Sequence, residues 1–276
     1  GQMIGRILAV ARTELLIVRR NRWLFLATLI MLLFALALTF AGSAPTGTLG
    51  VDRLTVAVAS MTTLSVYLAP LLALMMSFDS IAGEADRGSL SLLLSYPAGR
   101  GEIHGGKYLA HLAALSVAMI VGFGTAGAVA GATGGASLES VMALLRLLGT
   151  SILLGAVFLA FGYMLSSLAG SPAAAAGLSA ALWLVFVVLY DLGLLGAVVI
   201  DSGGYFTQKV FPWVLAANPA DAFRLWNVAG SADVALATGM AGVSSSLPVW
   251  AAPASLGFWL IAGFMAARTA FRRLEP

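Results

Sequence analysis

The sequence contains no cysteine and few charged residues. Without cysteine, disulfide bonds, thiolate metal sites and a cysteine nucleophile are excluded. Only 10% of the 276 residues are Asp, Glu, Lys or Arg, whereas a soluble domain usually has about a quarter. So few charges cannot cover a water-facing surface of this size, and 60% of the residues are hydrophobic. The composition therefore predicts a membrane protein.

Common catalytic and metal-binding motifs are also missing. The chain has no GxxxxGK[ST] phosphate loop and no HExxH motif. Its two histidines, His104 and His111, have no carboxylate pattern beside them, so we interpret them as interface residues, with His104 in a loop. The ten methionines form no MxxM array, and methionine is an ordinary filler of packed interiors. We expect no catalytic residue, no metal and no cofactor on this chain, and no nucleic-acid partner.

Six apolar runs are long enough to cross a hydrocarbon core, which takes about 20 residues in a helix. They cover residues 23–41, 56–78, 108–132, 141–168, 172–200 and 249–270. The segment 201–247 carries several charged residues and prolines, and we interpret it as a folded loop outside the membrane. We expect no cleaved signal peptide, because the charged segment before the first run is too long. The pattern predicts an all-α, polytopic domain over residues 3–276 with six transmembrane helices.

Lysine and arginine are distributed unequally between the two sides that six spans would create. Eleven of the 15 share a side with the termini: Arg6, Arg12, Arg19, Arg20, Arg22, Arg87, Arg100, Lys107, Arg268, Arg272 and Arg273. The other four are Arg53, Arg146, Lys209 and Arg224. Positive charges favour the cytoplasmic side of a membrane. We therefore predict an inner-membrane protein with cytoplasmic termini and a periplasmic 201–247 loop.

Residues 3–20, before the first span, have the pattern of an amphipathic helix. The apolar face consists of Ile4, Leu8, Ala11, Leu15 and Val18. Such a helix can lie in the membrane interface with its arginines toward anionic lipid headgroups. The alternative is an ordinary basic segment before a span.

One ionisable residue, Asp191, falls inside a predicted span. A carboxylate in the membrane is costly unless it is paired, hydrated or protonated. Two interpretations stay open: a structural hydrogen bond between helices, or part of a conduit.

The loop 79–107 between the second and third spans has the most distinctive pattern. An acidic turn precedes a leucine-rich turn that is too short to span, and a break and a basic entry into the next span follow. Leu90, Leu93 and Leu94 would share one face, which suits a groove on a partner. The charged residues around this turn are Glu84, Asp86, Arg87 and Arg100. They could set the register of docking.

This loop resembles that of ABC-2-type permeases, in which Glu-x-x-x-Gly-(Ser/Thr)-Leu precedes a Pro-x-x-Arg break and a Gly-Lys pair. The matching positions are Glu84, Gly88, Ser89, Leu90, Pro97, Arg100, Gly106 and Lys107. The resemblance implies that the loop is a coupling helix, which docks onto a separate cytoplasmic ATPase that binds ATP and Mg. The chain itself would then be a non-catalytic permease subunit.

Within this family, the chain is most similar to permeases that serve the maturation of nitrous oxide reductase. The similarity rests on Arg20-Asn21-Arg22-Trp23, the turn at 95–101, and the motifs at 211–213 and 218–225. It implies a homodimer, two ATPase subunits and a periplasmic β-helical partner that together serve assembly of the copper centres, by transport or by conformational signalling to the periplasmic partner. The residues expected to dock that partner are Pro212, Trp213, Asn218, Pro219, Asp221, Phe223 and Arg224. The alternative for this loop is a self-contained cap on the bundle.

Two other functions compete with this one. An ABC-2 exporter of a lipid, drug or polysaccharide would share the same coupling loop. A stand-alone secondary transporter or intramembrane enzyme would usually place several ionisable residues at the bilayer midplane. Asp191 alone qualifies here, which disfavours the second alternative.

Overall fold

The computed structural model describes residues 2–20, 22–41, 50–95, 97–238 and 246–274, and these ranges contain helices and no strand. The helices are α1 (Gln2–Arg20), α2 (Arg22–Ala41), α4 (Arg53–Ser77), α5 (Asp79–Asp86), α6 (Leu90–Leu94), α7 (Arg100–Gly134), α8 (Leu138–Leu168), α9 (Pro172–Leu184), the π-helix η1 (Val185–Leu189), α10 (Tyr190–Asp201), the π-helix η2 (Phe206–Val210), α11 (Phe211–Ala217), α12 (Pro219–Ala229), α13 (Ala232–Thr238) and α14 (Ala251–Arg272). Asn21, Tyr96 and residues 239–245, which belong to motifs and segments singled out above, lie outside the described residues.

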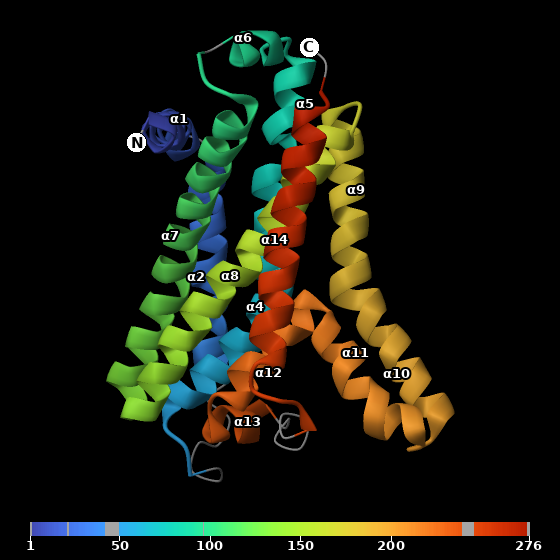
Figure 1. Cartoon of the computed structure of the whole chain (residues 1–276). Helices are drawn as coiled ribbons and strands as arrows, with labels where there is room; N and C mark the ends of the chain where they lie inside the picture. Colours follow the sequence, from blue (N-terminus) through green and yellow to red (C-terminus); the bar gives the residue numbers. More distant parts are fainter. Residues whose placement is uncertain (1, 21, 42–49, 96, 239–245, 275–276) are drawn as a thin grey trace.

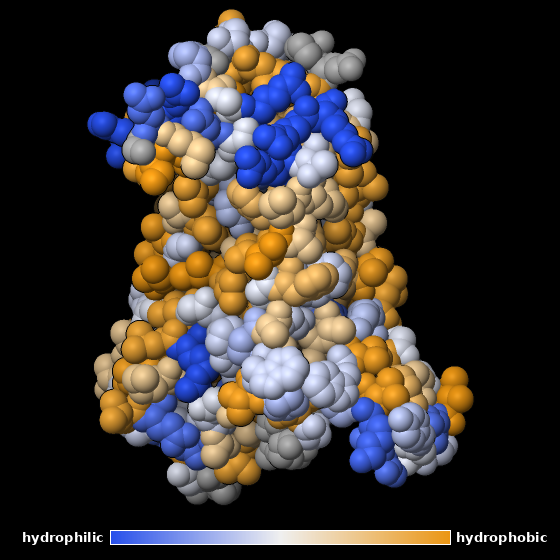
Figure 2. Space-filling model, viewed as in Figure 1, coloured by the Kyte–Doolittle hydropathy of each residue, from blue (hydrophilic) through white to orange (hydrophobic). Residues whose placement is uncertain are grey.

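Six helical segments are long and apolar enough to cross a membrane, as the sequence predicts. They are α2, α4 with α5, α7, α8, the continuous α9–η1–α10, and α14, and they run side by side (Figure 1). On the face shown in Figure 2, apolar side chains cover most of the middle of the bundle, and hydrophilic residues gather toward its two ends. The all-α, six-span prediction is confirmed.

Helix α7 begins well before the predicted start of the third span at residue 108. It starts at Arg100, directly after the break at Gly99. The Glu102 carboxylate accepts a hydrogen bond from the Gly99 amide at 2.8 Å, which supports the helix start. His104 was expected in a loop. It instead lies inside this helix, fully buried among Tyr163 and neighbouring phenylalanine rings, so that expectation is wrong.

Helix α8 forms the centre of the bundle, where it packs against α4, α7 and α14. Its approach to α4 is close because Gly162 has no side chain: a Cβ there would lie 1.8 Å from the Ser77 hydroxyl oxygen. The same pair of helices shares a buried hydrogen bond between Ser65 and Ser151, 2.9 Å long. Small residues thus set the distance between the central helices.

Residues 201–247 were expected to form a loop outside the membrane, but part of this segment turns back along the bundle. Helices α11 and α12 form a hairpin beside α14, and α12 also packs on α8 and α4 (Figure 1). At the turn, the Asn218 amide donates to the Phe186 carbonyl at 2.7 Å, halfway along the α9–α10 span. The indole of Trp259 in α14 donates to the Ala217 carbonyl at 2.7 Å. The hairpin therefore fills space between spans and is not only a surface loop.

Helix α1, seen end-on in Figure 1, lies against the side of α7 near the end of the bundle that carries α6 and the C-terminus. It packs on α7 at Gly106, where an added Cβ would meet Val10 at 2.6 Å. Most of the predicted apolar face stays free: Ile4, Leu8 and Leu15 are exposed, whereas Ala11 is half-buried and Val18 is buried. A helix with one face on the bundle and an exposed apolar stripe has the geometry of an interfacial helix.

Candidate functional site at the α5–α6 turn

The segment singled out in the sequence forms a short helical cap at the end of the bundle. Helix α5 follows α4 after Phe78, and its first amides are anchored on α8: Ile81 N and Ala82 N both donate to the Ser166 hydroxyl at 2.9 Å. Gly88 then reverses the chain with a φ of +71°, a conformation that glycine adopts without steric cost. Helix α6 follows directly and lies across the end of the bundle.

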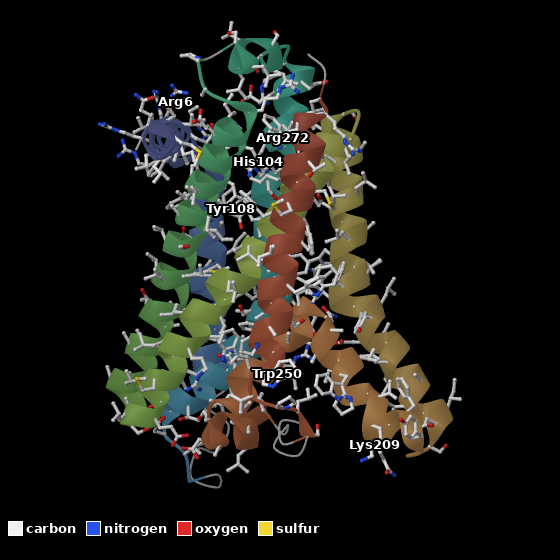
Figure 3. All side chains as sticks on the ribbon, viewed as in Figure 1. Arg6, His104, Tyr108, Lys209, Trp250 and Arg272 are labelled. Atoms are coloured by element: carbon white, nitrogen blue, oxygen red, sulfur yellow. The ribbon has the colours of Figure 1, made fainter. Side chains whose placement is uncertain are left out.

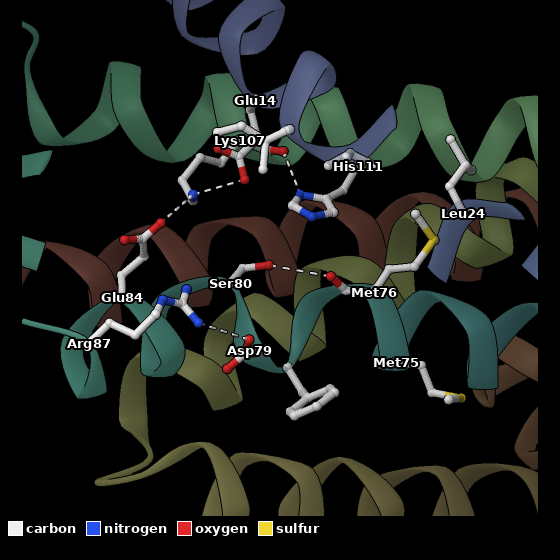
Figure 4. Close-up of a pocket in the computed structure, with 13 residues that line it drawn as sticks. Glu14, Leu24, Met75, Met76, Asp79, Ser80, Glu84, Arg87, Lys107 and His111 are labelled. Carbon is white, nitrogen blue, oxygen red and sulfur yellow. Dashed lines mark hydrogen bonds and ion pairs between the residues drawn. The ribbon is translucent and has the colours of Figure 1, made fainter. Parts of the chain in front are cut away.

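A buried lysine connects this cap to two other elements. Lys107 of α7 is only 2% exposed, and its ammonium lies 2.9 Å from Glu14 Oε1 of α1 and 3.5 Å from Glu84 Oε1 of α5 (Figure 4). Glu84 also accepts a hydrogen bond from the Ser89 hydroxyl at the start of α6. The Lys107 ammonium thus joins α1, α5 and α7, and the hydrogen bond from Ser89 to Glu84 connects α6 to the same group. We call Glu14, Glu84, Ser89 and Lys107 the ionic hub.

The other charged residues of the expected coupling set are held less firmly. Arg87 lies 3.6 Å from Asp79 in an exposed pair, which contributes little stability. Asp86 is exposed. Arg100 donates from Nη1 to the carbonyls of Arg272, at 2.8 Å, and Leu274. Arg100 therefore fastens the start of α7 to the end of α14, while Asp86 and Arg87 remain accessible.

The leucines of α6 share a face, as their spacing predicts, but that face does not point outward. Leu90 is buried, and Leu93 and Leu94 pack against the core. The bundle covers Leu90, whereas Leu93 and Leu94 are half-buried and Leu93 also lines the groove beside Leu92, so a contact of these two residues with a partner stays a prediction. The outward residue is Leu92, 66% exposed, beside a groove of about 530 Å³ that runs between α6 and α1 and is also lined by Pro97.

Two members of this region were not found from the sequence. Glu14 is the sole acidic residue of α1, and that isolation among apolar and basic residues was the available signal. Ser166 carries no such signal, because serine is common in membrane spans. His111, expected at an interface, is buried next to the hub, where its Nδ1 lies 2.6 Å from the Tyr163 hydroxyl and 3.0 Å from the Lys107 carbonyl.

Between the middle of the α9–α10 span and its far end, Asp191 is part of an ion-pair network. Arg224 of α12 lies 3.6 Å from Asp191 of α10 and 3.1 Å from Asp221. Asp221 is 1% exposed. Of the two interpretations of Asp191, this pairing between elements favours the structural one.

The residues expected to dock an outer partner are mostly inside the bundle. Pro212, Asn218, Pro219, Asp221 and Phe223 are buried, and Arg224 is half-buried. These residues form no surface, because α12 packs between α8 and α14. Trp213 is the exception: it is 49% exposed, and its ring lies 6.0 Å from that of the exposed Trp250.

The chain is similar to a known family of membrane transporters over nearly its whole length. Residues 8–275 match the family described as ABC-2 family transporter protein. The chain belongs to this family. It is a multi-pass membrane permease of an ABC transporter, and such a permease is the non-catalytic component.

Two relatives align over nearly their whole length, and both bear the name "Probable ABC transporter permease protein NosY". The protein from Pseudomonas aeruginosa is 40% identical over 269 residues, which cover 96% of this chain and 97% of the relative. The protein from Stutzerimonas stutzeri is 38% identical over 274 residues, which cover 98% and 99%. The similarity to NosY permeases thus extends beyond the α5–α6 turn to the complete bundle.

Within the residues that the structure describes, no group of three or more His, Asp or Glu side chains could hold a metal ion.

Proposed function

We propose that this permease couples ATP hydrolysis by a separate cytoplasmic ATPase to assembly of the copper centres of nitrous oxide reductase in the periplasm. The similarity to two NosY permeases over nearly the full chain supports this role. ATP and Mg are held by the partner, and the permease transmits the conformational change. Both termini are cytoplasmic, in keeping with the excess of arginine at the end that carries α1 and α6.

The ATPase docks at α6 in this proposal. Leu92 projects from α6 beside the groove that borders α1, and an exposed leucine next to a concave surface suits a helix-in-groove contact. Asp86 and Arg87, both exposed, set the orientation by charge. The ionic hub makes α1, α5 and α7 follow α6 when the ATPase moves it.

Helix α8 carries the motion to the outer side, and this arrangement is the observation on which the proposal chiefly rests. At one end of α8, Ser166 holds the first amides of α5. Toward the other end, Thr150 accepts a hydrogen bond from Asn227 of α12 at 2.8 Å, and Glu139 accepts one from Ser231 at 2.8 Å. A helix of 31 residues is about 46 Å long, so α8 can link the two ends as a rigid rod.

The outer partner is a periplasmic β-helical protein, and Trp213 with Trp250 provides its contact. Exposed aromatic residues are the usual anchors of protein interfaces. Two copies of the permease form the functional unit. The α9–α10 span is the least buried of the longer spans in the single chain, and it provides apolar surface for a second copy.

The test is affinity purification of the detergent-solubilised chain from its native host, with wild type, Leu92→Asp and Leu138→Asp compared. Leu138 is 81% exposed at the opposite end of the bundle, so it controls for the added charge and the lost leucine. We expect the wild type and Leu138→Asp to recover an ATPase and a periplasmic β-helical protein. Leu92→Asp should lose the ATPase alone.

Two other outcomes would contradict parts of this proposal. Recovery of the ATPase without a periplasmic protein, together with lipid-stimulated ATP hydrolysis, would favour the exporter of a lipid, drug or polysaccharide. An unchanged ATPase yield with Leu92→Asp would remove α6 from the coupling contact.

A further inference from the structure

A second cavity lies on the side of the bundle, apart from the ionic hub. It has a volume of about 600 Å³ and sits between the start of α1, the start of α7 and the end of α14. Its walls combine apolar side chains, Met3, Ile7 and Phe264, with charged ones. Figure 3 places Arg272 at this end of α14, level with Arg6 on the neighbouring α1.

The charged residues that line this cavity carry a net positive charge. They are Arg100, Arg268, Arg272 and Glu102. The single carboxylate already has partners: Glu102 accepts from the Gly99 amide and lies 3.7 Å from Arg6. Arg100 is occupied with the carbonyls at the end of α14. Arg268 and Arg272 are left without a carboxylate within salt-bridge distance in the described part of the chain.

Arg268 forms part of the inner wall of the cavity, where its guanidinium packs beside Gly101. Its Nε is buried and has no hydrogen-bond partner among the described residues, so this guanidinium is not neutralised or engaged by the protein at that atom. A guanidinium presents a fork of donors that matches the oxygens of phosphate, and a second arginine beside it favours an anion of that class.

The location of the cavity indicates which kind of molecule carries that anion. The exposed Ile4, Leu8 and Leu15 of α1 mark the level of the membrane interface. In Figure 2, hydrophilic side chains gather over α1 and over the end of α14, directly next to the apolar belt. A ligand with a phosphate at the arginines and an apolar chain along Met3, Ile7 and Phe264 fits both halves of the cavity.

We propose that this cavity binds the phosphate of an anionic phospholipid, with Arg268 and Arg272 as the recognising residues. Arg100 lines the same cavity. It is also the first residue of α7, the helix that follows α6 in the chain. A bound lipid therefore touches the junction between the α6 cap and the bundle. Headgroup binding here is independent of the proposed role in copper-centre assembly.

The experiment measures lipid binding to the purified full-length chain by native mass spectrometry. The probes are dioctanoyl phosphatidylglycerol, dioctanoyl phosphatidylcholine and inorganic phosphate. The variants are Arg272→Gln, Arg268→Gln/Arg272→Gln, and Arg19→Gln/Arg20→Gln as a control with the same change in charge on α1. Arg272 is exposed in the last turn of α14, so the single variant should fold even if the double variant does not.

We expect one phosphatidylglycerol site per chain that phosphatidylcholine does not fill and inorganic phosphate does not displace. Each interfacial arginine contributes about 1 kcal/mol toward an anionic headgroup, so the double variant should bind about 30-fold more weakly and Arg272→Gln about fivefold more weakly. The α1 control should keep wild-type affinity for this site. Equal binding by wild type and both cavity variants would overturn the proposal, and displacement by inorganic phosphate would overturn its assignment to lipid.

Discussion

Removal of the Lys107 ammonium is the sharpest perturbation of the ionic hub. Lys107→Met keeps an unbranched apolar stem that is one atom shorter, and it leaves Glu14 and Glu84 facing each other without their cation. Breaking a buried ion pair by removal of one partner costs about 3–5 kcal/mol. The Glu14 and Glu84 side chains retain 14% and 23% exposure, so water offsets part of the loss. We expect a destabilisation of about 3 kcal/mol, at the lower end of that range.

The assay is the free energy of unfolding from SDS titration of the chain in mixed micelles. The chain offers a matched control, since its other lysine, Lys209, is exposed at the far end of the bundle (Figure 3). Lys209→Met should change the free energy of unfolding by no more than about 0.5 kcal/mol, as is usual for exposed sites.

A second substitution tests the electrostatic reasoning directly. In Lys107→Met/Glu14→Gln, one of the two uncompensated carboxylates is gone, so part of the stability should return, about 1 kcal/mol or more relative to Lys107→Met. If the two losses simply add, or if Lys107→Met unfolds within 1 kcal/mol of wild type, the lysine does not hold the hub together as described. Amide hydrogen exchange in α1 and α5 would show whether both elements loosen together.

Three further predictions address other links in the bundle. Ser166→Ala removes the acceptor of two α5 amides and should cost about 1–3 kcal/mol with faster hydrogen exchange in α5, whereas Ser167→Ala, its buried neighbour, should leave α5 unchanged. Asn218→Ser keeps a helix cap on α12 but loses the donor to Phe186, so thermal unfolding in detergent should show a loss of about 1 kcal/mol, and no loss would mean that this bond does not hold the hairpin. Desolvation raises the pKa of Asp52, but the hydrogen bonds it accepts at the start of α4 and α8 outweigh this and place the pKa below its usual value. The stabilisation by the carboxylate is then present above the unfolded pKa of about 4 and is lost as pH falls through the folded pKa, so the difference in melting temperature between wild type and Asp52→Asn should shrink as the pH is lowered below about 4, and a pH-independent difference would contradict it.

The six spans could be predicted because each is a local property of the chain. About 20 apolar residues in sequence suffice to cross a bilayer whatever surrounds them, and the predicted runs agree with the helices at most ends to within a few residues. The α5–α6 turn was also readable, since Gly88, the leucine run and the break at Pro97 are consecutive in the sequence. The apolar run predicts a start of the third span at residue 108, but α7 begins at Arg100, where Glu102 supports the first turn of the helix.

The orientation of side chains within those elements was decided by tertiary structure. Spacing placed Leu90, Leu93 and Leu94 on one face but could not say whether the bundle or a partner covers that face. The same limit applied to α12, whose buried Phe223 was taken for an outer anchor. A helical pattern defines faces relative to the helix axis, and only the neighbouring helices determine which face is inside.

Consecutive residues were thus enough to fix the class of the protein, its six spans and the position of the α5–α6 turn. Tertiary structure alone decided which charges meet. Lys107 and Glu14 are 93 positions apart, and Asp191 meets Arg224 from a separate helix. A charge in or near a membrane must find a partner to offset the cost of leaving water, but the partner can come from any helix that packs nearby. The composition shows that each such charge needs a partner, and only the packing of the helices determines which residue that partner is.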